Sequence, residues 1–466
     1  MSNPAFTSPY LQGAAAPVSD ELDLSNLEVI GEIPAGLRGT YLRNGPNPAF
    51  PSKGEYHIWD GDGMVHALTF DNEGVHYRNR WISTPPLQAE QRHGRALYGG
   101  MMDSETPDPE LVGNAGLYKN PANTNIVRHA GKLLALWEGG LPTAMTDDLE
   151  TLGTDDFSGA LRGPMTAHPK IDPVTGEMFA FGGAPFPPYL RIHTIDAAGK
   201  MVKSVEIDLP RPVMIHDFLV TEEHIVVFDS PLIFDFEGHA QTGSLLRWAP
   251  EYGTRIGVMP RYGEASDMRW LESDICNVFH FLNGWTEGNK IELTASSMPW
   301  VSIDFQKSEP PEGVDGNAYL NSFSIDLGTG HVGQRQIGEI AGDFCKVADS
   351  VAGMKHRYGY MSSFSSGEGT GADFDAITMY DLETGSESSR GFGPETFVGE
   401  CAFAPNVLGN GAEDDGWIVN YVYAKDGSES EFVVIDPHDF LGEPVARIRM
   451  PRRVPIGFHG NWVPAT

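Results

Sequence analysis

Four histidines stand in apolar or turn-forming segments of the chain and could share one metal ion. They occur in Thr-Ala-His168-Pro-Lys, Met-Ile-His216-Asp-Phe, Val-Phe-His280-Phe-Leu-Asn and Gly-Phe-His459-Gly-Asn-Trp. The gaps between them are 48, 64 and 179 residues, so no single helix or hairpin brings them together. A fold that returns the chain repeatedly to one central axis could do so, and four neutral imidazoles there would suit a borderline metal such as iron or zinc. Taken singly, each is more often an ordinary core or surface histidine.

Three carboxylates stand in similarly apolar surroundings. They are Glu138 in Leu-Trp-Glu-Gly-Gly, Asp343 in Ala-Gly-Asp-Phe-Cys and Glu400 in Val-Gly-Glu-Cys-Ala-Phe. A metal-bound histidine needs an acceptor for its other ring nitrogen, usually a carboxylate. A carboxylate buried without a partner would be costly, so each acid should have one. The ligand histidines are the obvious candidates.

The elements that must position these residues are predicted to be short β-strands. An apolar strand repeatedly runs into Asp, a polar turn, then Gly or Pro, at Asp71, Asp172, Asp196, Asp326, Asp381 and Asp436. Asp bonds its own backbone to start such a turn, and Gly supplies the positive φ that closes it. The last three of these aspartates lie 55 residues apart each time. That period suits the blades of a β-propeller, and roughly seven of them would use most of the chain, with loops and short helices over one face.

The chain ends and the cysteines bear on organisation and compartment. Residues 1–25, rich in Pro, Ala and Ser, are predicted to be an arm, and residues 26–466 one propeller domain. The N-terminus lacks the basic and apolar regions of a secretory signal, and no window approaches 18 apolar residues, so we expect a soluble cytoplasmic protein. Three cysteines, Cys276, Cys345 and Cys401, suit a reducing compartment. We expect them to be small core residues rather than redox sensors.

The charge balance limits the partners. The chain carries 32 basic and 64 acidic residues, a net charge of −32. A field of that sign repels phosphate, which argues against nucleic acid and against an anionic membrane surface. At most we expect peripheral membrane contact to collect a substrate.

The motifs together resemble the carotenoid cleavage oxygenase family, which includes apocarotenoid oxygenases, lignostilbene dioxygenases and the vertebrate retinoid isomerase. The likeness runs from about Gly39 to Trp462. It includes the four histidine segments and Gly-Thr-Tyr-Leu-Arg-Asn-Gly-Pro-Asn-Pro (39–48), Asp-Gly-Asp-Gly-Met-Val-His (60–66), Asn-Pro-Ala-Asn-Thr-Asn (120–125) and Lys-His-Arg-Tyr-Gly-Tyr (355–360).

The resemblance implies a seven-bladed propeller with a cap over an axial metal site. It implies one Fe(II) per chain, with His168, His216, His280 and His459 as ligands. It also implies that Glu138, Asp343 and Glu400 support three of the four, and that the Thr124 methyl group partly occludes an open coordination position. Asp343 stands where the family usually has glutamate. Because it is one methylene shorter, we expect a bridging water or a small strand shift there.

The ligand set indicates the chemistry. Four neutral imidazoles leave the iron its full charge and up to two positions for O₂ and solvent. No NAD, flavin or P-loop fingerprint offers another source of electrons. The electrons must then come from the substrate, so we expect a conjugated alkene to be cleaved by O₂ into two carbonyl fragments.

Substrate choice is predicted from four apolar residues. Lignostilbene dioxygenases resemble one another in placing a lysine before the first supporting glutamate, and a tyrosine upstream, to bind a phenol. Here those positions hold Trp137 and, by counting from Trp59, Met101. A site of Trp59, Met101, Trp137 and Phe279 would pack a carotenoid or apocarotenoid chain, although all four could be plain core residues. Stilbene cleavage is an alternative, as is a non-catalytic propeller or a retinoid-type binder and isomerase.

Overall fold

A computed structural model describes residues 8–100, 105–242, 244–301, 310–369 and 371–465 of the chain. The described residues form seven antiparallel sheets of at least four strands and one two-stranded ribbon. The chain groups into two compact units, one of residues 1–162 with 392–466 and one of residues 163–391. The all-β class predicted from the sequence is thus confirmed.

The first unit contains three of the large sheets, two of which combine strands from both of its chain segments. The first sheet has the order β1 (Asp23–Leu24), β5 (Val75–Trp81), β4 (Gly63–Phe70), β3 (Gly39–Pro46) and β33 (Gly460–Pro464). The second runs β6 (Asn125–His129), β7 (Lys132–Leu136), β8 (Thr143–Met145), β9 (Thr151–Thr154). The third runs β2 (Val29–Gly31), β32 (Ala446–Arg449), β31 (Ser430–Ile435), β30 (Gly416–Ala424) and β28 (Thr396–Val398), and β29 (Ala402–Pro405) also pairs with β30.

The second unit contains four sheets whose strands follow one another in sequence order. The first runs β10 (Lys170–Ile171), β11 (Met178–Gly183), β12 (Leu190–Ile195), β13 (Met201–Ile207), and the second runs β14 (Leu219–Val220), β15 (His224–Asp229), β18 (Thr254–Pro260), β19 (Arg269–Ser273). The third runs β20 (Asn277–Glu287), β21 (Lys290–Met298), β22 (Tyr319–Asp326), β23 (Val332–Gln336). The fourth runs β24 (Gly342–Lys346), β25 (Tyr358–Ser363), β26 (Ala376–Asp381), β27 (Ser386–Gly391). The ribbon pairs β16 (Leu232–Phe234) with β17 (Leu246–Trp248).

Helices are few and short. The first unit carries α1 (Pro85–His93) and α2 (Pro109–Val112), and the second carries α3 (Phe236–Thr242). Thr84 caps the start of α1, and Gly94 ends it in the left-handed conformation. Among the described residues, no helix is long and apolar enough to span a membrane.

The aspartate turns form as the sequence predicts. Asp326 Oδ1 accepts the amide N–H groups of Gly328 and Thr329, both at 2.9 Å, and Gly330 has a φ of 76°. Asp381 does the same between β26 and β27, where Gly385 has a φ of 70°. Only glycine adopts that conformation without strain, so each turn reverses the chain into the outer strand of its sheet.

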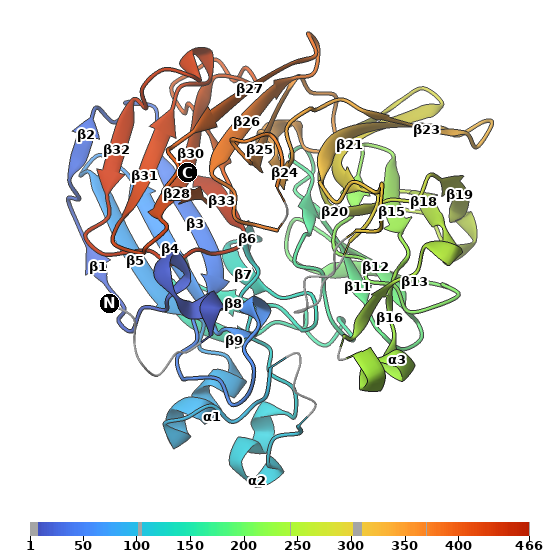
Figure 1. The fold of residues 1–466 in the computed structure, drawn as a ribbon, viewed down its shortest axis with the longest axis horizontal. Helices are drawn as coiled ribbons and strands as arrows, with labels where there is room; N and C mark the ends of the chain where they lie inside the picture. The colour runs from blue at the N-terminus through green and yellow to red at the C-terminus, as the bar shows by residue number, and fades with distance from the viewer. Residues whose placement is uncertain (1–7, 101–104, 243, 302–309, 370, 466) are drawn as a thin grey trace. The chain divides into compact units, whose positions relative to one another are not determined.

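The first unit closes by pairing strands from opposite ends of the sequence. β3 pairs with β33, with Tyr41 opposite Trp462, and β2 pairs with β32 (Figure 1). Both pairs flank a core in which Tyr41 and Tyr421 lie fully buried. Part of the predicted N-terminal arm packs here too, because Ala14 is buried and its N–H donates to Lys425 O. The domain boundary at residue 25 stays a prediction.

A histidine, His193, lies in the core at a position where the apolar pattern of its strand does not explain a buried polar side chain. His193, in β12, is 1% exposed, and neither ring nitrogen has a hydrogen-bond partner among the described residues. Burial, with a smaller contribution from Arg191, lowers the pKa of His193 to about 4. Between about pH 4 and 6.5 this ring is therefore neutral in the folded protein but protonated in the unfolded chain.

We expect His193→Leu to reduce the acid sensitivity of the fold. The pKa of His193 is lower in the folded state, so its neutral ring has its full effect on the free energy of unfolding above about pH 6.5. As the pH falls towards 4, protonation of the unfolded chain lowers that free energy by on the order of 3 kcal/mol. Melting temperatures at pH 7.5 and 5.0 measure this difference. It should shrink in His193→Leu and stay as in the wild type in the control His438→Leu, whose ring is mostly exposed. An unchanged difference in His193→Leu would refute this.

Candidate metal centre

Three of the four predicted histidines converge within the second unit. His168 Nε2 lies 3.1 Å from His216 Nε2, which in turn lies 3.2 Å from His280 Nε2. Their ligand nitrogens all lie within 4.8 Å of one another. His168 and His280 are buried and His216 is half-buried. The sequence gaps that excluded a single helix are thus bridged by three different sheets of the unit, since these residues precede β10, precede β14 and lie in β20.

The spacing of these nitrogens suits a divalent metal ion. His216 Nε2 takes part in both contacts, and in a neutral ring it can either donate or accept but not both. One donor with one acceptor satisfies at most one of the two contacts when His280 keeps its hydrogen on Nδ1, so a cation among the three nitrogens explains the arrangement better. Metal–nitrogen bonds of about 2.0–2.1 Å place two ligands at right angles roughly 3 Å apart. The observed 3.1 and 3.2 Å fit that geometry. The donor set is entirely imidazole, which suits iron, zinc, copper or nickel.

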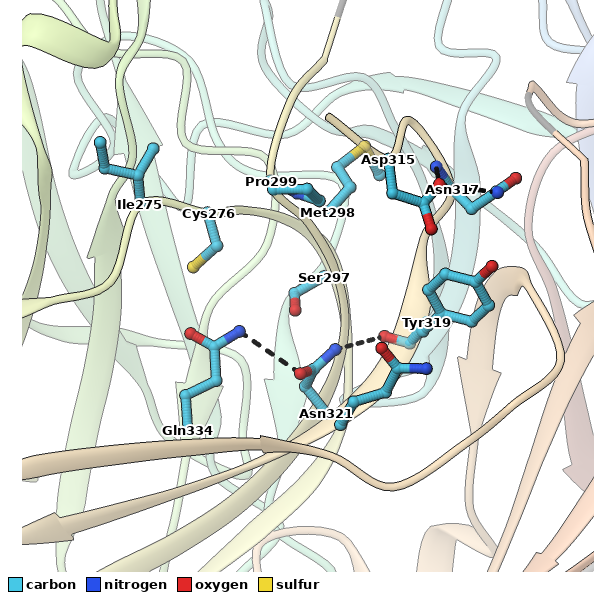
Figure 2. A pocket seen from close by; sticks show the side chains of 11 residues that line it. Ile275, Cys276, Ser297, Met298, Pro299, Asp315, Asn317, Tyr319, Asn321 and Gln334 are labelled. Atoms are coloured by element: carbon cyan, nitrogen blue, oxygen red, sulfur yellow. Dashed lines mark hydrogen bonds between the residues drawn. The ribbon is translucent and has the colours of Figure 1, made fainter. Parts of the chain in front are cut away.

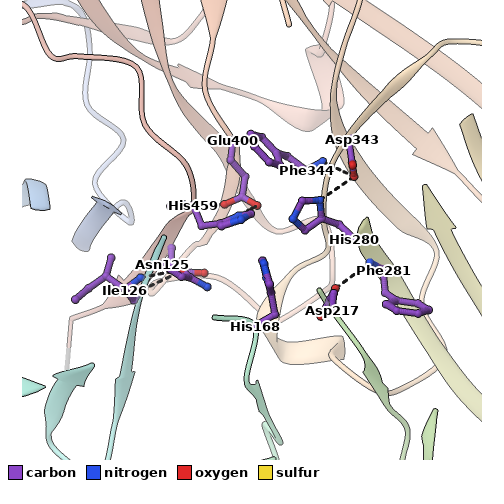
Figure 3. A network of polar contacts seen from close by, with 12 residues as sticks. Asn125, Ile126, His168, Asp217, His280, Phe281, Asp343, Phe344, Glu400 and His459 are labelled. Atoms are coloured by element: carbon purple, nitrogen blue, oxygen red, sulfur yellow. Dashed lines mark hydrogen bonds and ion pairs between the residues drawn. The ribbon is translucent and has the colours of Figure 1, made fainter. Parts of the chain in front are cut away.

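His280 is held by Asp343 directly. The His280 Nδ1 atom lies 3.0 Å from Asp343 Oδ1, which also accepts the N–H of Phe344 at 2.8 Å (Figure 3). The pairing of β24 with β25 is irregular between Asp343 and Lys346, and Phe344 has a φ of 57°. Of the two expected ways to accommodate the shorter acid, the structure therefore has an irregular strand and a direct contact rather than a bridging water.

His459 is held in the first unit by Glu400. Its Nδ1 atom lies 3.0 Å from Glu400 Oε1, while Glu400 Oε2 accepts the N–H of Gly460 at 2.7 Å. The backbone N–H of His459 donates to Thr124 O at 3.1 Å. Tyr41 donates its hydroxyl hydrogen to Glu400 O at 2.7 Å. Both oxygens of the carboxylate and the main chain of the histidine are thus fixed, and the contact at Nδ1 points to Nε2 as the ligand atom of this ring.

The other predicted site residues lie as follows. Trp137 and Glu138 follow β7 directly, and both are half-buried, as is Thr124. The ring of Phe279 packs edge-on against His216, with 5.6 Å between centroids. Trp59 packs edge-on against His57 at 4.8 Å. Met101 lies outside the described residues. The roles of Glu138 and Thr124, and a shared substrate tunnel, stay predictions.

One acid near the histidines was not predicted. Asp217 directly follows His216, is buried, and accepts the backbone N–H of Phe281. The sequence signal was an acid inside the apolar segment Met-Ile-His-Asp-Phe, the same kind of signal that selected Glu138, Asp343 and Glu400.

A separate cavity of the second unit is too small for a long apolar substrate. It measures about 200 Å³ and has a mixed lining, with polar side chains such as Asn321 and Gln334 and apolar ones such as Ile275 and Met298 (Figure 2). Small-molecule sites usually measure roughly 300–1,000 Å³ and are mostly apolar. Cys276 borders the cavity, and burial, aided by Asp274, raises the pKa of its thiol to about 12. A thiol with that pKa is unreactive at neutral pH, which supports a core role.

Comparison with known proteins identifies the family. The family model described as retinal pigment epithelial membrane protein matches residues 15–464. The carotenoid cleavage oxygenase of Mycobacterium tuberculosis (strain CDC 1551 / Oshkosh) is 33% identical, over 98% of this chain and 98% of its own. This chain belongs to the carotenoid cleavage oxygenase family. Carotenoid 9,10(9',10')-cleavage dioxygenase 1 of Phaseolus vulgaris is also 33% identical, over 97% of this chain and 89% of its own.

Solved structures of the family share the fold. Pseudomonas brassicacearum lignostilbene dioxygenase has a TM-score of 0.90 at 30% identity, covering 100% of both chains. Cobalt-substituted Synechocystis ACO has a TM-score of 0.86 at 30% identity, covering 96% of this chain and 97% of that one. The seven sheets are therefore the blades of a seven-bladed β-propeller, as predicted, and the chain is an oxygenase.

We expect metal retention to depend on the contact between Asp343 and His280 and on that between Glu400 and His459. Asp343→Asn and Glu400→Gln should each lower metal affinity about 10–100-fold, because the ligand remains while the group that orients it is weakened. Asp343→Glu should also lose affinity, since the direct 3.0 Å contact leaves no room for a longer side chain. Metal content after dialysis against a chelator measures this.

Asp381→Glu is the matched control, because Asp381 pairs with Arg357 on the same sheet and contacts none of the four histidines. Metal retention that is equal in Asp343→Glu and in the wild type would show that the strand tolerates either acid.

Proposed function

We propose that this protein is an iron(II) dioxygenase that cleaves one conjugated C=C bond of a carotenoid or apocarotenoid with O₂, giving two carbonyl products. The observation that carries the proposal is the convergence of the Nε2 atoms of His168, His216 and His280. The proposal includes His459 as the fourth ligand and one iron per chain. The names of the relatives support the reaction class.

Iron is favoured over zinc for a chemical reason. Imidazole suits both metals, but zinc has no redox chemistry, and an oxygenase must activate O₂. When bound, the iron supplies that activation. The chain then has to provide neutral ligands, a dry site and a fixed substrate position.

The residues in place meet the first of these needs. Asp343 at His280 and Glu400 at His459 each accept from Nδ1, so each ring keeps its hydrogen there and presents Nε2 as a lone pair. We assign Glu138 the same role towards one of the two remaining histidines, His168 or His216. No carboxylate needs to bind the metal, so the positive charge of the ion stays available for O₂. Burial of His168, His280 and His459 keeps bulk water away.

The proposed substrate class rests on the residue before Glu138. Trp137 is half-buried and offers an apolar face where a lysine would bind a phenol. Trp59 and Phe279 are also aromatic and half-buried. A polyene has no polar group to satisfy, so aromatic faces bind it well, whereas a buried phenol would lack a partner. Stilbene cleavage is the second candidate, because the lignostilbene dioxygenase structure matches the whole chain.

The first test is metal and product analysis of the purified enzyme. We expect about one iron per chain, and two carbonyl fragments by mass spectrometry from a carotenoid or apocarotenoid under O₂. His→Ala at 168, 216, 280 or 459 should abolish both metal binding and turnover, because each change removes a ligand. His438→Ala is the control. Stoichiometric zinc, with oxygenase activity undiminished after iron removal, would contradict the proposal.

The second test concerns specificity. Trp137→Lys should lower kcat/KM for an apocarotenoid and raise it for resveratrol. A lysine ammonium facing an apolar ring is left unpaired, at about 1–3 kcal/mol, and a phenol satisfies it. Trp137→Met, which keeps the site apolar, should retain the apocarotenoid preference. A wild-type enzyme that prefers resveratrol, with apocarotenoid turnover unaffected by Trp137→Ala, would exclude both the substrate class and the role of Trp137.

A further inference from the structure

We infer that Asp217 is a positioning residue that holds three histidine-bearing segments of the second unit in register. It is not a metal ligand. Its carboxylate instead binds the chain next to each of His168, His216 and His280. The inference rests on the proposed metal-binding function of those histidines.

Each segment is tied by a different bond. His216 is the residue before Asp217. Asp217 Oδ2 accepts the backbone N–H of Phe281, the residue after His280, at 3.0 Å (Figure 3). Asp217 Oδ1 lies 2.7 Å from Nζ of Lys170, two residues after His168. One carboxylate thus joins segments whose histidines are 48 and 64 residues apart in sequence.

The bond to Phe281 lies at an irregularity of the strand that carries His280. The pairing of β20 with β21 shifts register between Val278 and Phe281, so Phe279 and His280 bulge out of the ladder. A bulge re-aims its side chains and leaves backbone groups unpaired. β20 is an edge strand of its sheet, and Asp217 Oδ2 accepts the N–H of Phe281 at the end of this bulge. The carboxylate therefore fastens the backbone directly beside His280.

Burial makes the arrangement sensitive to loss of any one partner. The Asp217 side chain is 2% exposed and that of Lys170 is 29% exposed. A buried carboxylate is tolerated only when it is paired and hydrogen-bonded, as here by Lys170, Phe281 and the N–H of Phe218 at 2.8 Å. The charges of Asp217 and Lys170 cancel, so the pair adds little net charge near the histidines. Its effect is on position, and metal sites need ligands held within about 0.5 Å.

The test uses Asp217→Asn, Lys170→Met and the double variant, each loaded with cobalt(II) alone. The visible spectrum of bound cobalt reports ligand geometry, and release to a chelator reports affinity. We expect Asp217→Asn to shift the spectrum and speed release at least 10-fold. Lys170→Met, which frees only the His168 segment, should have a smaller effect. The effects of the two substitutions should not add up in the double variant, because both break the same ion pair between Asp217 and Lys170.

Asp229→Asn is the matched control. Asp229 is equally buried in the same unit and is ion-paired with Arg211 and Arg255, with no contact to a histidine segment. It should lower the melting temperature while the cobalt spectrum and release rate stay as in the wild type. A spectrum and release rate for both Asp217→Asn and Lys170→Met that match Asp229→Asn would overturn the inference. Failure of the wild type to bind cobalt or iron would instead refute the proposed function.

Discussion

Each imidazole that faces a metal depends on what its far nitrogen touches. A ring has two nitrogens and one hydrogen when neutral, so an Nε2 lone pair is available only if Nδ1 keeps the hydrogen. Asp343 and Glu400 impose this on His280 and His459 at the same distance of 3.0 Å. Neighbouring elements hold those two acids in place. The Tyr41 hydroxyl fixes the Glu400 main chain, and the irregular β24 carries Asp343.

The backbone around the histidines departs from regular β structure for the same reason. A strand in perfect register sends alternate side chains to opposite faces, so it cannot change the direction of a single histidine ring. The shift in β20 and the positive φ of Phe344 are local departures at His280 and at its acid. Beside each of them a carboxylate accepts a backbone N–H, Asp217 from Phe281 and Asp343 from Phe344. Both acids thus bind the main chain of the site, and Asp343 also supports the ring of His280.

The sequence could predict the parts that side-chain chemistry specifies. The Asp326 and Asp381 turns, the all-β class and the pairing of Asp343 and Glu400 with one histidine each follow from residue types and their surroundings. The direct contact of Asp343 could not be predicted, because it depends on a left-handed Phe344 that no glycine marks. The role inferred for Asp217 also escaped, since its partner at Phe281 is a backbone N–H. Every non-proline residue carries that donor, so the sequence gives no hint of which one is unpaired.

The pairing of β3 with β33 sets an order of assembly. The second unit is one continuous stretch, so all the strands of its four sheets are available to pair once residues 163–391 have left the ribosome. The sheet that contains β33, the strand after His459, forms later. Its strand β3 pairs with β33, and Tyr41 and its partner Trp462 lie near opposite ends of the chain. Glu400 Oε2 likewise has no Gly460 N–H to accept until then. The contacts that fix the His459 ring therefore cannot form before the chain is almost complete, whereas His280 and Asp343 are available to each other as soon as their own unit has been synthesised.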